Sequence, residues 1–172
     1  MPTYTISPAE FFSPEKQEAD LALIACPGAE ALTQQIDAHL IGWAKEAGIT
    51  KDTFIVASDC PRFQSGDAKG LVKGSIRGHD VFLVVDPGNY SLTYNLFGNE
   101  NHMSPDDHYA NLKRLIQAVA GRAHRVSVIM PSLYGGRQHR RISRESLDCA
   151  VALQELQAMG VSNIITFDAH DP

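Results

Sequence analysis

Short apolar runs alternate with segments of helical periodicity along most of this chain. The apolar runs are residues 21–26, 53–57, 81–86, 125–130 and 163–167. Each has the length of a buried strand, and several of the segments between them repeat apolar residues at the spacing of one helix face. Alternating strands and helices favour right-handed βαβ units, whose strands are parallel. The sequence therefore predicts an α/β fold, a doubly wound, mostly parallel sheet with helices on both faces.

The predicted helices carry signals at their ends. Their expected bounds are residues 30–47, 104–121 and 143–160. The middle helix has the clearest start, because Ser104 can act as an N-cap and is followed by a first-turn proline and two aspartates. Ser143 with Glu145 is expected to start the last helix. A glycine at or just after each predicted end favours termination there.

Three other segments lack this periodicity. Residues 1–20 contain three prolines and are expected to be an extended arm or a family-specific extension. Residues 61–78 have glycines at four-residue intervals from Gly66 to Gly78, which favours a β-hairpin or flap over a packed core element. Residues 87–103 are rich in Gly and Asn and predict a long, partly mobile polar loop.

The size and charge of the chain limit its class. A chain of 172 residues with 44% hydrophobic composition suits one cored domain. Its net charge of -5 argues against nucleic-acid and membrane-surface binding, which require broad basic patches. No apolar run approaches the roughly 20 residues that span a bilayer. Three cysteines without CxxC spacing suggest neither a disulfide framework nor a zinc site. We expect a cytoplasmic protein.

The most basic stretch of the chain directly follows a predicted strand. Four arginines fall within the eight residues 137–144, behind the pair Gly135 and Gly136. Guanidinium groups bind phosphate oxygens bidentately and keep their charge, and glycines let the backbone approach a ligand closely. A solvated surface or an oligomer contact is the alternative reading of such a cluster. Since ligands of doubly wound folds bind at the carboxyl ends of the strands, this stretch and residues 168–170 are candidate site segments.

Three patches of sequence together resemble one family. Residues 137–141 read Arg-Gln-His-Arg-Arg, residues 62–67 read Arg-Phe-Gln-Ser-Gly-Asp, and residues 167–170 read Phe-Asp-Ala-His. In this order and spacing they are similar to motifs of the ribose-phosphate pyrophosphokinases, also called phosphoribosyl pyrophosphate synthases, in the amino-terminal domain. The resemblance implies a phosphoribosyltransferase-like fold. It also implies transfer of diphosphate from Mg-ATP to ribose 5-phosphate, which gives phosphoribosyl pyrophosphate and AMP.

The resemblance also assigns roles to individual residues. The positions that it implies for ATP binding are Arg137, Gln138, Phe63, Ser65, Asp67 and His139. Arg140 and Arg141 take catalytic positions, where they would stabilise the charge of the transition state. His170, supported by Asp168, takes the position that ligates Mg²⁺ or orients its waters. The flap residues are usually donated by a neighbouring subunit in this family, so a homo-oligomer is expected.

The sequence departs from the family pattern in ways that leave alternatives open. His139 and Ser65 replace aspartates, and the segment 87–103 is longer than the corresponding family connection. The ribose-phosphate loop of the family's second domain has no counterpart here. We therefore expect residues 21–172 to be the amino-terminal nucleotide-binding domain, inactive in isolation. The alternatives are a noncatalytic homologue acting as an assembly or regulatory subunit, and an unrelated doubly wound phosphate-binding domain.

Overall fold

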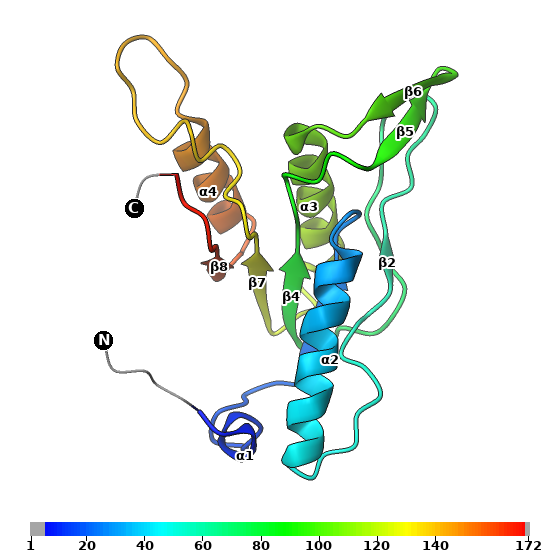
Figure 1. The fold of residues 1–172 in the computed structure, drawn as a ribbon, viewed down its shortest axis with the longest axis vertical. Coiled ribbons are helices and arrows are strands. Elements are labelled where there is room, and N and C mark those ends of the chain that lie inside the picture. Colours follow the sequence, from blue (N-terminus) through cyan, green and yellow to red (C-terminus); the bar gives the residue numbers. More distant parts are fainter. Residues whose placement is uncertain (1–5, 171–172) are drawn as a thin grey trace.

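A computed structural model describes residues 6–170, and a four-stranded parallel sheet lies at its centre (Figure 1). Its strands, in the order β1-β4-β7-β8, are β1 Leu21–Ala25, β4 Asp80–Val84, β7 Arg125–Ile129 and β8 Asn163–Ile165. Neighbouring strands pair in register, with Asp80 opposite both Leu21 and Arg125. Helices cover both faces, so the predicted α/β class and parallel sheet are confirmed.

The predicted strand at residues 53–57 is reduced to one parallel bridge, between Ile55 and Leu23. The amide of Leu23 donates to the carbonyl of Phe54 at 2.8 Å, which attaches this segment to the free edge of β1. The buried carboxylate of Asp37 accepts hydrogen bonds from the Phe54 amide at 2.7 Å and from the Thr53 hydroxyl at 2.8 Å. Residues 53–57 therefore lie on one side of β1 and β4 lies on its other side, so the order of the strands reverses at β1. In sheets with such a reversal, ligands bind at the carboxyl ends of the strands.

The two faces of the sheet bury different helices. Helix α2 (Glu30–Glu46) covers one face, where its Ala44 is buried together with Leu23 and Phe54. Helices α3 (Pro105–Val119) and α4 (Asp148–Ala158) cover the other face (Figure 1). The larger core lies under α3 and α4, and its fully buried members include Ile24, Leu83, Leu112, Leu115 and Leu156. Its alternate strand residues point toward α3 and α4, as expected for a two-sided parallel sheet.

Helix α3 begins with the predicted capping residues. The Ser104 hydroxyl accepts a hydrogen bond from the Asp107 amide at 3.2 Å, and the Asp107 carboxylate accepts one from the Ser104 amide at 2.9 Å. Burial tends to raise the pKa of Asp107, but the bonds from Ser104 and the charge of Arg62 outweigh it, and the pKa is lowered. This capping box fixes the helix start at the carboxyl edge of the sheet.

The expected N-terminal extension is folded onto the domain in its described part. Ser7 caps a short helix, α1 (Pro8–Phe11). Phe11 meets Trp43 edge-on at 5.6 Å between ring centroids, and Phe12 stacks on Phe54 at 6.0 Å. The prediction of an extended arm is therefore wrong for these residues, because two adjacent aromatic side chains find partners on and beside α2. Residues 1–5 lie outside the described part.

The expected loop at residues 87–103 contains an antiparallel hairpin. Strand β5 (Thr93–Leu96) pairs with β6 (Asn99–His102), and Phe97 and Gly98 connect them with φ of 49° and 86°. Two positive φ angles characterise the tight turn that matches strand twist. The loop prediction is wrong here because the strands are polar and because Phe-Gly takes the place of the usual Asn-Gly.

Residues 61–78, expected to be a β-hairpin or flap, follow a short strand and are tied to the core. Strand β2 (Ser58–Asp59) pairs antiparallel with β3 (Leu71–Val72), and a bridge joins Arg62 to Ala68. Ile76 is buried in the main core, and a Cβ on Gly70 would lie 2.5 Å from the carbonyl oxygen of Arg114. The expectation that this segment is free of the core is therefore wrong at its base. A flap function for its tip stays a prediction.

Helix α4 begins later than predicted. Its N-cap is Leu147, which provides no side-chain cap, and not Ser143. The Glu145 carboxylate accepts a hydrogen bond from the Ile142 amide at 3.1 Å, so the expected starting residues form a separate loop. Within residues 6–170, no helix combines the length and apolarity needed to cross a membrane. Cys26, Cys60 and Cys149 are buried free thiols.

Candidate functional site

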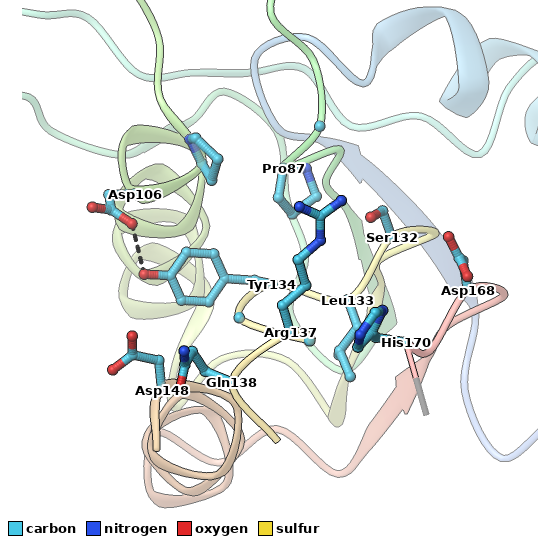
Figure 2. Close-up of a pocket in the computed structure, with 14 residues that line it drawn as sticks. Pro87, Asp106, Ser132, Leu133, Tyr134, Arg137, Gln138, Asp148, Asp168 and His170 are labelled. Carbon is cyan, nitrogen blue, oxygen red and sulfur yellow. Dashed lines mark hydrogen bonds between the residues drawn. The ribbon is translucent and has the colours of Figure 1, made fainter. Parts of the chain in front are cut away.

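A cleft of about 440 Å³ opens at the carboxyl edge of the sheet, where β4, β7 and β8 end (Figure 2). Its lining includes the residues after β4, the start of α3, the turn after β7, the start of α4 and the end of the chain after β8. These lining residues are Pro87, Gly88, Pro105, Asp106, Ser132, Leu133, Tyr134, Gly135, Gly136, Arg137, Gln138, Asp148, Asp168 and His170. The fold thus places the two candidate site segments at one opening.

The turn that carries Arg137 and Gln138 is fixed by backbone hydrogen bonds. The Gln138 amide donates to the Gly135 carbonyl at 2.8 Å. The Gln138 carbonyl in turn accepts from the Cys149 amide of α4 at 3.3 Å. Gly135 has a φ of 68°, a conformation that other residues adopt at a cost. Arg137 and Gln138 are exposed, and in Figure 2 the guanidinium of Arg137 lies between the Tyr134 side of the cleft and Asp168.

Substitution of Gly135 by alanine should destabilise the fold by about 2 kcal/mol. The added Cβ would lie 3.0 Å from the backbone nitrogen of Cys149, in addition to the strain of the positive φ. Urea denaturation monitored by circular dichroism measures this loss. Gly121→Ala is the matched control, because Gly121 has a φ of 72° with no atom within 4 Å of an added Cβ. Equal losses in the two variants would contradict close packing of the turn on α4.

The end of the chain after β8 lies beside this turn. Asp168 forms a parallel bridge with Ser132, and its amide donates to the Pro131 carbonyl at 2.9 Å. His170 follows two residues later, and its ring centroid lies 5.6 Å from that of His139. The structure thus brings Arg137, Gln138, Asp168 and His170 to one cleft, and their functional roles stay predictions.

The donors Asp168 and His170 fit Mg²⁺ only as part of its ligand set. Magnesium prefers six oxygen ligands and keeps several waters, and one or two protein groups with substrate phosphates suffice to hold it. Among residues 6–170, no three His, Cys, Asp or Glu side chains come together as a metal cluster. Magnesium binding by Asp168 and His170 therefore stays a prediction, in which phosphate oxygens and water supply the other ligands.

The opposite wall of the cleft is aromatic and acidic. The Tyr134 hydroxyl donates to the Asp106 carboxylate at 2.8 Å, and Asp148 lies at the start of α4 beside Gln138 (Figure 2). Burial and the bond to Asp106 raise the pKa of Tyr134 to about 12. Sequence reasoning missed Tyr134, Asp106 and Asp148. The available signal was position, because both aspartates stand in the first turn of a helix at the carboxyl edge.

The remaining arginines of the basic stretch do not line this cleft. Arg140 and Arg141 are exposed in the loop between the turn and α4. His139 is half-buried at the edge of the cleft, where its Nδ1 lies 3.1 Å from the Gly136 carbonyl oxygen. The catalytic positions expected for Arg140 and Arg141 thus lie outside the cleft as the loop stands.

The candidate flap residues also lie away from the cleft of their own chain. Phe63 is 54% exposed, and the Ser65 hydroxyl donates to Asp67 at 2.8 Å. The base of this turn is held by Arg62, whose Nη1 lies 3.1 Å from an Asp107 carboxylate oxygen. Its guanidinium also lies over the ring of Tyr94, at 4.0 Å from the centroid. The structure therefore does not bring Phe63, Ser65 and Asp67 to Arg137 within one chain.

Comparisons with known proteins agree with this architecture. Residues 21–160 match the family model described as the N-terminal domain of ribose phosphate pyrophosphokinase. The fold is similar to the crystal structure of phosphoribosylpyrophosphate synthetase from Mycobacterium smegmatis, with a TM-score of 0.65 and 21% sequence identity. That match covers 88% of this chain and 43% of the synthetase chain, so this chain spans less than half of the synthetase's length. A comparison with curated proteins found no match.

Proposed function

Because the chain belongs to the ribose phosphate pyrophosphokinase family through its N-terminal domain, we propose that it is the nucleotide-binding half of a ribose-phosphate diphosphokinase. The complete reaction transfers diphosphate from Mg-ATP to ribose 5-phosphate and yields phosphoribosyl pyrophosphate and AMP. The observation that carries the proposal is the shared cleft of Arg137, Gln138, Asp168 and His170. An arginine beside a carboxylate and an imidazole suits a phosphate chain that carries a metal.

The cleft residues take separate roles in this proposal. Arg137 donates hydrogen bonds to phosphate oxygens, and Gln138 offers an amide to the base or the sugar. Asp168 and His170 hold Mg²⁺, which supplies charge neutralisation to the phosphates when bound. These residues keep the nucleotide oriented for attack by the sugar hydroxyl, since phosphoryl-transfer enzymes act mainly by positioning and electrostatic stabilisation.

Arg140 and Arg141 require a movement to act in this reaction. They stand on an exposed loop that borders the cleft between the turn and α4. We propose that this loop closes on bound nucleotide and brings their charges to the oxygens of the transferring group. A closing loop of this kind also excludes water from the reacting phosphates.

The flap residues are proposed to act in a neighbouring copy of the chain. Phe63 is exposed and separate from its own cleft, which leaves its ring available to stack on a nucleotide bound by another protomer. Asp67 would accompany it, with Ser65 in the position of a second flap carboxylate. The proposed functional form is therefore a homo-oligomer.

An activity assay tests the proposed reaction. The 172-residue chain, given Mg-ATP and ribose 5-phosphate, should form no AMP above the background rate. The same chain joined to a carboxyl-terminal domain of this family should form AMP and phosphoribosyl pyrophosphate in equal amounts, detected by chromatography. An Arg137→Ala change in the joined chain should reduce the rate. A joined chain that is folded and oligomeric but forms no product would contradict the proposal.

A noncatalytic assembly or regulatory subunit is the second candidate function. It is favoured by His139 and Ser65, which stand where the family pattern has aspartates. A subunit of this kind would associate with itself or with catalytic partners and would not bind Mg-ATP. Nucleotide binding therefore separates the two candidates.

A further inference from the structure

Two stacked tyrosines connect the turn that carries Arg137 with α3 and α4. The rings of Tyr109 and Tyr134 are parallel, with 4.3 Å between centroids and 3° between planes. Tyr109 is buried on α3, whereas Tyr134 stands three residues before Arg137 and lines the cleft. The Tyr134 hydroxyl donates to Asp106 in the first turn of α3 at 2.8 Å. The turn is thus joined to α3 by both a ring stack and a hydrogen bond.

The same pair reaches α4. The Tyr109 hydroxyl lies 2.9 Å from the Ala152 carbonyl oxygen and 3.1 Å from a Glu155 carboxylate oxygen. Lys113 holds Glu155 from the other side, with 3.1 Å between its Nζ and the same carboxylate oxygen. A continuous set of contacts therefore runs from α4 through Tyr109 to Tyr134. A displacement of Tyr134 would require several of these contacts to change together.

These contacts lie beside Arg137, and they affect how much conformational freedom Arg137 loses when it binds a ligand. Arg137 is exposed, and the loop that follows it is exposed as well. A long side chain on a loosely held turn loses more conformational entropy when it binds than one on a fixed turn. Tyr134 restrains the backbone on the amino side of the turn, while the bond from Cys149 to Gln138 restrains the carboxyl side.

We propose that Tyr134 is a positioning residue, which holds the turn bearing Arg137 and Gln138 against α3 and α4 so that it is ready to bind a nucleotide. The identity of the ligand rests on the proposed function. The restraint of the turn itself does not, since it follows from the contacts within the chain.

Tyr134→Phe removes the hydroxyl and keeps the ring stack. It should raise the dissociation constant for Mg-ATP, measured by titration calorimetry, about 3- to 10-fold. In an Arg137→Ala background the same change should have less than about a twofold effect, because Tyr134 acts through Arg137. Amide hydrogen exchange at Gln138 should become about 3- to 10-fold faster in Tyr134→Phe. Exchange at Asp168, whose amide donates to Pro131, should stay unchanged.

Tyr90→Phe is the matched control, because Tyr90 is 69% exposed and lies outside the cleft lining. It should leave affinity and Gln138 exchange at wild-type values. Unchanged Gln138 exchange in Tyr134→Phe would overturn the proposal, as would an equal loss of affinity with and without Arg137. If the wild-type chain fails to bind Mg-ATP, the proposed function fails, and the exchange measurement still decides whether Tyr134 restrains the turn.

Discussion

Arg137→Ala should weaken Mg-ATP binding by about 1.5 to 3 kcal/mol, the scale of a hydrogen bond between charged groups. This corresponds to an increase of about 10- to 150-fold in the dissociation constant. Among the arginines of the basic stretch, Arg137 lines the cleft, together with Asp168 and His170. Its loss would remove the guanidinium that is proposed to bind the phosphate oxygens. Titration calorimetry of the wild-type and variant chains under the same magnesium concentration measures the difference.

Arg144→Ala is the control for general charge. It removes one positive charge from the same basic stretch, but Arg144 is exposed and lies outside the cleft lining. We expect less than a twofold change in affinity, which should vanish as ionic strength rises because exposed charges are screened. Equal losses in Arg137→Ala and Arg144→Ala would mean that the stretch attracts phosphate without a defined site.

Arg125→Ala should lower the free energy of unfolding by about 2 to 3 kcal/mol, through the buried carboxylate that it leaves behind. The Asp80 side chain is 6% exposed and accepts from Arg125 Nε at 2.7 Å, with a second contact to Nη2. The two residues are also opposite each other on β4 and β7, so the ion pair joins the central strands. Because Arg125 is partly exposed and water screens the pair, the expected loss of unfolding free energy is smaller than the full cost of an unpaired buried charge. Urea denaturation at neutral pH measures it.

Two further variants isolate the effect of the buried charge. The double variant Asp80→Asn with Arg125→Ala should be more stable than Arg125→Ala alone, since it removes the unpaired carboxylate. Lys73→Ala breaks an ion pair with Asp59 in which both side chains are at least half exposed, and it should cost about 0.5 kcal/mol or less. If Arg125→Ala costs no more than Lys73→Ala, the Asp80–Arg125 pair does not stabilise the sheet.

The central sheet and its helices could be predicted because their signals are local. Apolar runs of strand length, helical spacing and the capping residues at Ser104 are readable from the sequence alone. The β5-β6 hairpin could not be read in this way, because its strands are polar and Phe97 occupies a turn position that normally favours Asn or Gly. The start of α4 was misplaced because Glu145 bonds to Ile142 and leaves Ser143 outside the helix.

The candidate site could be predicted where topology decides it. Arg137 and Asp168 follow neighbouring parallel strands, so the sheet brings them together at one edge. Tyr134 could not be assigned, since its stacking on Tyr109 depends on how the turn after β7 packs against α3. The position of Phe63 relative to a bound nucleotide depends on contacts between copies of the chain, which the fold of one chain does not determine.

The most direct test of the account is to titrate the 172-residue chain separately with Mg-ATP and with ribose 5-phosphate in a calorimeter. In the proposed function this chain carries the nucleotide half of the site, and the sugar-phosphate half is expected in a second domain. We predict saturable binding of Mg-ATP, weakened by Arg137→Ala, and no saturable binding of ribose 5-phosphate. Absence of Mg-ATP binding by the folded chain at millimolar nucleotide would contradict the account.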